Sequence, residues 1–277
     1  MYTLSFSMKL LIYIIVFLYG VVIGSFLNVC ILRIPNGETI VSERSHCMKC
    51  GYQLAWFDLI PLFSYIFLRG RCRKCGEKIS LQYPLIEALN GILWTVTLAV
   101  CGFNMHSILC MAVISAMVVL SMIDARTMEI PVGINIFIFV IAVINFAFSF
   151  AGNYINKNSF TYNFFTSHMD GWLSYVLGFV SVSVFLLLVY FITKGRGIGG
   201  GDIKLMAAAG LFLGLKLIIF AFVVACLYAC IIHIARMKIT KASHVLAMGP
   251  YLSAGILSAM WFGKKAVDLY LNFVLGK

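Results

Sequence analysis

The chain opens on an apolar run, residues 10–32, which reads LLIYIIVFLYGVVIGSFLNVCIL and is bounded by Lys9 and Arg33. A helix of roughly 20 such residues crosses the hydrocarbon core of a bilayer. A cleaved signal peptide would have a shorter apolar region of roughly 7–15 residues and a small-residue cleavage site. This run is longer and lacks that site, so we expect residues 1–32 to form a retained first transmembrane helix.

The composition of the whole chain agrees with this start. Of its 277 residues, 62% are hydrophobic and 11% are charged, whereas a soluble domain is about half apolar and a quarter charged. These values exclude a disordered chain, a coiled coil and an ordinary cytosolic enzyme. The sequence therefore predicts an all-α polytopic membrane protein in a lipid bilayer, with about eight transmembrane helices (range six to eight). The seven further spans are expected near residues 85–103, 107–123, 132–150, 172–193, 203–214, 217–235 and 248–263.

The net charge of +11 could indicate a nucleic-acid partner. We instead expect the positive charge to lie in cytoplasmic loops, as the positive-inside rule describes, with no nucleic acid bound. If the N-terminus is outside, the loops at 33–84, 124–131, 194–204 and 236–247 face the cytoplasm. They then hold 15 of the 21 Lys and Arg residues. This bias supports a multi-pass protein with its N-terminus outside.

Residues 33–84 differ from the spans, because they are rich in charge and contain two Cys-x-x-Cys pairs. The pairs are Cys47 with Cys50 and Cys72 with Cys75, and 21 residues separate them. Such spacing can place four thiolates around one Zn²⁺, and a glycine after each pair suits a tight turn. We expect a small cytoplasmic insert that binds a structural zinc.

Two other interpretations of the four cysteines stay open, namely unpaired thiols and two disulfides. Disulfides are disfavoured in a reducing cytoplasm. A zinc ion with four protein ligands is closed to substrate, and its role would be to fold a segment too small to bury its own core.

Two aspartates lie at the ends of predicted spans. Asp124 ends the third span, and Asp202 begins a later one in Gly197-Ile-Gly-Gly-Gly-Asp-Ile-Lys-Leu205. Ionisable residues in such places are functional candidates. On the orientation above, both lie at the cytoplasmic face.

The three glycines before Asp202 carry no Cβ, so a substrate backbone can approach closely there. We therefore take Gly199, Gly200 and Gly201 as the place where an extended substrate lies, with Lys204 beside it. Irregular backbone at membrane depth is tolerated where it lines a watered cavity.

Two close carboxyl groups can share one proton, so that one activates water while the other protonates the substrate carbonyl oxygen. Structural roles are the alternatives: Asp124 could pair with Arg126, and Asp202 could cap its helix. Glu87 and Glu129 are further acids near the same face.

Taken in order, these segments resemble the prepilin peptidase family, also called type IV leader peptidases, of the Gly-x-Gly-Asp class of membrane aspartic peptidases. The resemblance rests on residues 24–35, both cysteine pairs, Asp58-Leu-Ile-Pro61, Tyr83-Pro-Leu-Ile-Glu87, residues 124–131, Gly199-Gly-Gly-Asp-Ile-Lys-Leu205 and Met248-Gly-Pro-Tyr251. The sequence departs from the family at Val132, where an acid is usual, and at Met248, where an aromatic residue is usual.

The resemblance implies removal of the leader from type 4 prepilins or pseudopilins, at the cytoplasmic face of the bacterial inner membrane. In the family this cleavage serves the assembly of type IV pili or protein secretion. Many members also N-methylate the new N-terminus with S-adenosylmethionine. Carried over, Asp124 and Asp202 are the catalytic pair, and the four cysteines are metal ligands tied to the methylating half.

The expected organisation is a first helix (1–32), a zinc insert (33–84) and a peptidase domain (85–277). The rival function is a proton-coupled transporter with the two aspartates as a relay. Transporters often have two matching interrupted helices, and only one glycine-interrupted segment is visible in the sequence.

Overall fold

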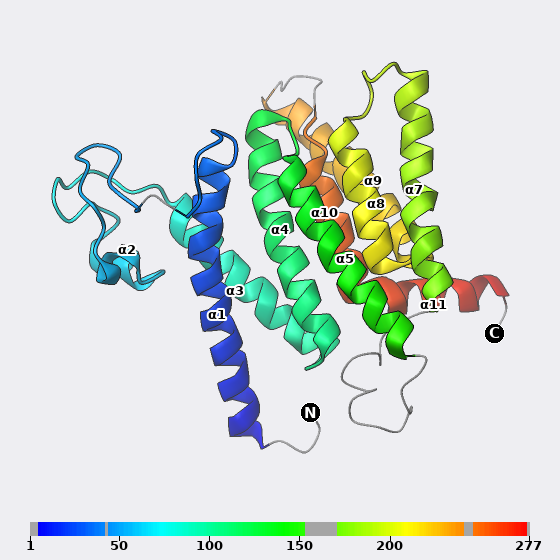
Figure 1. Cartoon of the computed structure of the whole chain (residues 1–277), viewed down its shortest axis with the longest axis horizontal. Helices are drawn as coiled ribbons and strands as arrows, with labels where there is room; N and C mark the ends of the chain where they lie inside the picture. The colour runs from blue at the N-terminus through cyan, green and yellow to red at the C-terminus, as the bar shows by residue number, and fades with distance from the viewer. Residues whose placement is uncertain (1–4, 42–43, 153–170, 241–245, 276–277) are drawn as a thin grey trace. The chain divides into compact units, whose positions relative to one another are not determined.

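The computed structural model of the protein describes residues 5–41, 44–152, 171–240 and 246–275. Helices dominate these ranges, which contain no β-strand and only two isolated bridges (Figure 1). The predicted all-α fold is therefore confirmed. The chain divides into two compact units, Met1–Gly102 and Phe103–Lys277.

The first unit is built on a pair of helices joined by buried asparagines. Its elements are α1 (Phe6–Arg33), the 3-10 helix η1 (Trp56–Leu59), α2 (Phe63–Phe67) and α3 (Gln82–Cys101). The side-chain amide of Asn28 on α1 donates to the Tyr83 carbonyl at 3.1 Å, and that of Asn90 on α3 donates to the Gly20 carbonyl at 2.7 Å. Amide side chains between apolar helices hold them together where lipid supplies no hydrophobic driving force.

The second unit is a bundle in which α4 is the most buried of the candidate spans. Its elements are α4 (Met105–Thr127), α5 (Val132–Gly152), α7 (Trp172–Ile192), α8 (Gly200–Leu213), α9 (Leu215–Thr240), α10 (Gly249–Ser258), the π-helix η2 (Ala259–Gly263) and α11 (Lys264–Leu275). Helix α4 packs against α5 and α10, while α8 packs against α5, α7 and α9. The end of α4 and the start of α8, where the two aspartates lie, are thus linked through α5.

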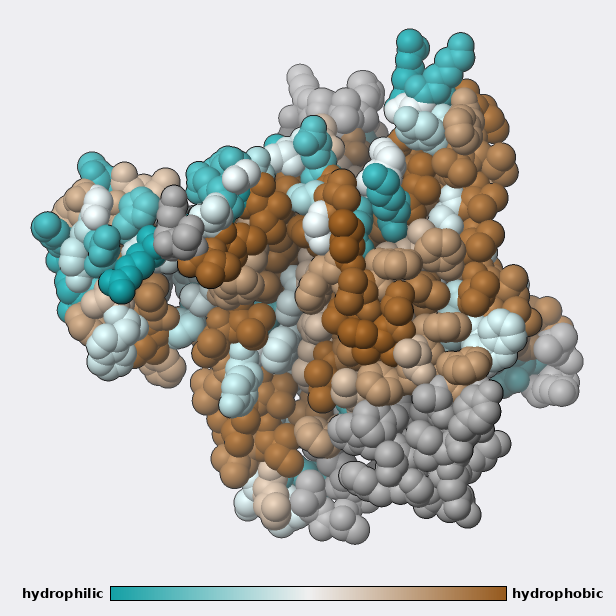
Figure 2. Space-filling view, viewed as in Figure 1, coloured by the Kyte–Doolittle hydropathy of each residue, from teal (hydrophilic) through white to brown (hydrophobic). Residues whose placement is uncertain are grey.

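Six described helices are long and apolar enough to cross a membrane, namely α1, α3, α4, α5, α7 and α9. Hydrophobic residues cover much of the helical surface in Figure 2, as expected for helices that face lipid. The protein is a multi-pass membrane protein, and the candidate spans within the described ranges number six, the low end of the predicted range. Residues 241–245, part of a predicted cytoplasmic loop, lie outside the described ranges.

The two predicted spans absent from these six are short helices in the structure. The span predicted at 203–214 is α8, whose 14 residues reach roughly 21 Å at 1.5 Å per residue. That is less than the ~30 Å of a hydrocarbon core. The span predicted at 248–263 consists of α10 and η2.

Two glycines bring the backbones of α7 and α8 into direct contact. A Cβ added to Gly210 would lie 2.1 Å from the Gly178 carbonyl oxygen, and one added to Gly178 would lie 2.5 Å from the Gly210 carbonyl oxygen. Small residues at a crossing allow such close approach between membrane helices. This crossing fixes α8, the helix that carries Asp202 in its first turn.

We expect Gly210→Ala to destabilise the protein by about 1–3 kcal/mol, because the added methyl group must push the two helices apart. Gly133→Ala is the matched control, since Gly133 on α5 is exposed and its added Cβ has nothing within 4 Å. Thermal unfolding in one fixed detergent measures both variants. Equal unfolding midpoints for both would contradict the close crossing.

Candidate active site and metal centre

Asp124 lies in the last turn of α4 with its carboxyl group buried. The helix ends at Thr127, and Met128 follows in a left-handed conformation with φ 55° that turns the chain toward α5. The backbone N–H of Gly249, the first residue of α10, donates to Asp124 Oδ2 at 2.7 Å. This bond orients the carboxyl group, so that Oδ1 is the oxygen that a further ligand would contact.

Asp202 is held in a similar way at the start of α8. The backbone N–H of Gly199, the residue before the helix, donates to Asp202 Oδ2 at 3.2 Å. The capping contact considered from the sequence is therefore present, but it uses one carboxyl oxygen only. Asp202 lies outside the six candidate spans. Burial raises the pKa of its carboxyl group to about 6, and the Asp124 carboxylate adds to that rise while the Gly199 N–H opposes it.

The Asp124 carboxylate contributes to the raised pKa of Asp202, which indicates an approach of the two side chains although 77 residues lie between them in the chain. The segment between α4 and α5 makes this approach possible. A Cβ on Gly201 would lie 2.8 Å from the Ile130 Cβ, so the chain packs tightly there. The Asn135 side-chain amide donates to the Gly201 carbonyl at 3.3 Å. Two contacts thus hold the first turn of α8 against the connection that follows α4 and against the start of α5.

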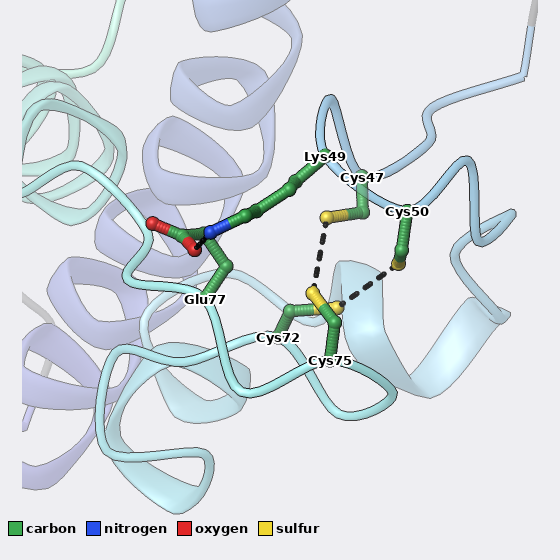
Figure 3. A network of polar contacts seen from close by, with 6 residues as sticks. All are labelled: Cys47, Lys49, Cys50, Cys72, Cys75 and Glu77. Carbon is green, nitrogen blue, oxygen red and sulfur yellow. Dashed lines mark hydrogen bonds and ion pairs between the residues drawn. The ribbon is translucent and has the colours of Figure 1, made fainter.

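The four cysteines of the first unit converge on one point. Their sulfur atoms all lie within 4.8 Å of one another, with Cys47 3.8 Å from Cys75 and Cys50 4.0 Å from Cys72 (Figure 3). Four sulfurs at about 2.3 Å from one tetrahedral zinc ion would be roughly 3.8 Å apart. The cluster therefore has the spacing that a zinc ion requires.

The two Cys-x-x-Cys segments have matching backbones. The N–H of Gly51 donates to the Cys47 carbonyl and that of Gly76 to the Cys72 carbonyl, each at 2.9 Å. Both glycines have positive φ, 68° and 72°, which glycine adopts readily. The tight turns predicted after each pair are thus present. An ion pair between Lys49 and Glu77 joins the two turns, as Figure 3 shows.

Comparison with known proteins connects both sites to one group of enzymes. Residues 18–101 match the "Bacterial Peptidase A24 N-terminal domain", and residues 111–234 match the "Type IV leader peptidase family". The chain is 30% identical over 264 residues to a "Prepilin leader peptidase/N-methyltransferase" of Bacillus subtilis, covering 95% of this chain and 99% of the relative. The chain belongs to the type IV leader peptidase family.

Other relatives with the same name agree with this assignment. The protein of Myxococcus xanthus is 31% identical over 224 residues, which cover 81% of this chain and 63% of the relative. The protein of Neisseria gonorrhoeae is 29% identical over 259 residues, covering 84% and 85%. No solved structure matches the chain. The family predicted from the sequence is thereby confirmed.

Within this leader peptidase the two sites fall in different matched regions. The four cysteines lie in the region 18–101, and both aspartates lie in 111–234. The transporter alternative gains no support, since the matched family and the relatives are named as peptidases. The catalytic role of Asp124 and Asp202 stays a prediction at this point.

The other predicted site residues are placed as follows in the leader peptidase. Gly199 and Gly200 are exposed, Gly201 is half-buried against Ile130, and Lys204 is exposed on α8. Of the two further acids, Glu129 is exposed, while Glu87 on α3 is buried and accepts a hydrogen bond from the Leu62 N–H at 2.8 Å. Glu87 therefore belongs to the first unit and joins the insert to its helix.

Two residues at the aspartate site were missed as participants by sequence reasoning. Gly249 entered only as part of a family motif, yet a Cβ there would lie 2.7 Å from Asp124 Oδ2, so no larger residue fits. Asn135 is buried and its Oδ1 has no hydrogen-bond partner in the described structure. An asparagine in the first turn of an apolar span was the available signal for it.

Proposed function

We propose that this leader peptidase is a membrane aspartic endopeptidase in which Asp124 and Asp202 act together on a peptide bond. The observation that carries the proposal is their shared setting: each carboxyl group is held through one oxygen by a glycine N–H, and the two interact electrostatically. Two carboxyl groups arranged in this way share a proton, because ionisation of both would place two negative charges close together, which is unfavourable.

The chemistry then needs no covalent intermediate. One aspartate takes a proton from water as the water oxygen adds to the peptide carbon, and the other donates a proton to the carbonyl oxygen. When the carbon–nitrogen bond breaks, a proton passes to the leaving amine. Burial and the Asp124 carboxylate raise the pKa of Asp202 to about 6, which favours its protonated form below that pH, so Asp202 is the proposed proton donor. Asp124 is then the acceptor of the water proton.

The proposed substrate is the leader segment of a type 4 prepilin or pseudopilin, cut at the cytoplasmic face of the bacterial inner membrane. The names of the relatives support this substrate. The 15 Lys and Arg residues assigned to the predicted cytoplasmic loops support this orientation, with the N-terminus outside. The proposed domain organisation is a first transmembrane helix (1–32), a metal-binding insert (33–84) and a peptidase domain (85–277).

We also propose that Cys47, Cys50, Cys72 and Cys75 hold a structural zinc ion, which the spacing of their sulfur atoms supports. With four protein ligands, the ion would serve folding of the insert. N-methylation with S-adenosylmethionine is proposed from the relatives' names alone. Within the described ranges, no set of side chains marks a place for that methyl donor.

The proposed function is tested with purified protein and a prepilin peptide in detergent. Loss of the leader is measured by mass spectrometry of the peptide, and methylation by a further gain of one methyl group. A single cut that leaves a defined new N-terminus supports the peptidase. An uncut peptide, with protein that unfolds cooperatively on heating, would count against it.

The exposed glycine Gly200 offers a specific test of substrate approach. A Cβ at Gly200 has nothing within 4 Å in the free protein, so Gly200→Val leaves the fold intact. We expect it to lower kcat/KM by about 10- to 100-fold, because the side chain keeps the substrate backbone away from Asp202. Cleavage kinetics and thermal unfolding are both measured.

The neighbouring position provides the contrast. At Gly201 an added Cβ meets Ile130 at 2.8 Å, so Gly201→Val lowers stability as well as turnover. Unchanged kcat/KM in Gly200→Val would show that the substrate does not lie along these glycines.

A further inference from the structure

The metal insert exposes an unusually apolar face. Within residues 56–67, the large apolar side chains of Trp56, Phe57, Leu59, Ile60, Phe63, Ile66 and Phe67 are all exposed, from 39% to 81%. These residues lie on η1, on α2 and, for Ile60, on the link between them, and we call them the apolar face of the insert. Soluble proteins seldom leave a contiguous apolar patch of more than a few hundred Å² in water. The prediction of residues 33–84 as a small cytoplasmic insert leaves this face unexplained.

The apolar face begins next to a membrane-spanning helix. Glu87, buried on α3, accepts the hydrogen bond of the Leu62 N–H directly before α2. Glu87 lies five residues after the first residue of α3, or roughly 7.5 Å along the helix at 1.5 Å per residue. The start of α2 is thus held beside the second turn of a candidate span.

A sharp bend at Leu62 sets the direction of α2. Leu62 has φ 61° and ψ −51°, and the Phe63 N–H donates to the Pro61 carbonyl at 2.7 Å. A non-glycine residue rarely adopts this conformation. The Glu87 carboxylate accepts a hydrogen bond from this bent segment, so the start of α2 is attached to α3 at that point.

The side chains of this region match the interfacial layer of a bilayer. Aromatic residues are enriched at that layer, and a Trp and three Phe residues lie on the apolar face. Exposed basic residues Arg69, Arg71 and Lys74 follow α2 directly. Basic side chains near an anionic surface contribute about 1 kcal/mol each to membrane binding. Figure 2 shows the insert with hydrophilic residues over its upper part and hydrophobic residues along its lower edge, where Figure 1 places α2.

We propose that the apolar face of the insert lies in the interfacial layer of an anionic lipid bilayer. Leu81 and Leu85, at the start of α3, are exposed apolar residues as well, so the helix to which the face is attached presents apolar side chains at the same end. The metal cluster is thereby held at the membrane surface, and the insert is a membrane-bound platform. This inference does not depend on the peptidase chemistry.

The test uses the fluorescence of Trp56 in the full chain reconstituted into vesicles. The chain has four tryptophans, so Trp94, Trp172 and Trp261 are replaced by Phe to leave Trp56 alone. Vesicles of phosphatidylcholine and phosphatidylglycerol are prepared with and without brominated acyl chains. We expect brominated lipid to quench most of the Trp56 emission, and aqueous iodide to quench little of it.

A matched control places the tryptophan on the polar side of the same insert. In the variant Lys78→Trp, with all four native tryptophans changed to Phe, the indole stands at an exposed position on the second cysteine turn. Iodide, and not brominated lipid, should quench this residue. If the single-tryptophan protein does not fold, the difference in quenching between the unmodified chain and Trp56→Phe measures the same quantity.

Each result decides the proposal. Quenching of Trp56 by brominated lipid supports it. Quenching by iodide alone would place the apolar face in water, and quenching by neither agent would show that protein covers it. Either of these two results would overturn the inference.

Discussion

Asp124→Asn and Asp202→Asn should each reduce kcat for leader cleavage by roughly 10³- to 10⁴-fold, as expected when one of two cooperating acid–base groups is lost. Asparagine has nearly the shape of aspartate, and its side-chain carbonyl oxygen can still accept the bond from Gly249 or Gly199. The fold should therefore survive both changes. The double variant should be no worse than either single one, because the two groups act as a unit.

The measurement is single-turnover cleavage of a prepilin peptide, followed by mass spectrometry, beside thermal unfolding of each variant. Glu129→Gln is the matched control, because Glu129 is the exposed acid of the same connecting segment. It should cleave at the rate of the unmodified enzyme. If either aspartate variant kept near-normal turnover, that aspartate would have no place in the mechanism. If Glu129→Gln cleaved slowly, Glu129 and not Asp124 would be assigned as the acceptor of the water proton.

The aspartates could be found from the sequence because acids at the ends of apolar runs are rare and expensive. Their partners could not be found in the same way. The bond from Gly249 to Asp124 spans 125 positions, and nothing in local periodicity connects residues so distant. Asn135 was missed for a related reason. Its role depends on the Gly201 carbonyl, which the α5–α8 packing brings to it.

The helical architecture followed from apolar runs, and the six candidate spans among the described residues lie within the predicted range of six to eight, but apolar runs alone could not show which short segments cross. An apolar run predicts burial, but a helix is buried equally well by lipid or by other helices. Helix α8 shows the difference, since its Leu205, Met206 and Phe212 are almost fully buried within the protein. Fourteen residues between glycine-rich ends make a helix too short to cross alone. The cysteine spacing, in contrast, predicted a local geometry, because four thiols in two short turns have few ways to meet.

Removal of the proposed zinc should unfold the insert while the spans remain folded. The reason lies in the burial of residues 44–80, among which only Asp58, Gly70 and Cys72 are buried. A segment with so little buried surface has no apolar core to stabilise it. Binding of a structural zinc ion contributes about 10–16 kcal/mol to folding in small domains. We therefore expect chelator-treated protein to be cut by trypsin within residues 44–80, where untreated protein resists.

A matched pair of thiol variants separates the metal from general effects of cysteine loss. Cys72→Ser removes a buried sulfur of the cluster, whereas Cys230→Ser removes an exposed sulfur on α9. Elemental analysis should find one zinc per chain in the unmodified protein and in Cys230→Ser, and a strongly reduced content in Cys72→Ser. Across all three proteins, trypsin cleavage inside the insert should increase as the zinc content falls. Equal resistance to trypsin with and without chelator would mean that contacts such as Lys49–Glu77 and Arg73–Asp58 suffice. Lys49 and Glu77 are both solvent-exposed, and an exposed pair contributes about 0–1 kcal/mol, so this pair is not expected to replace the zinc.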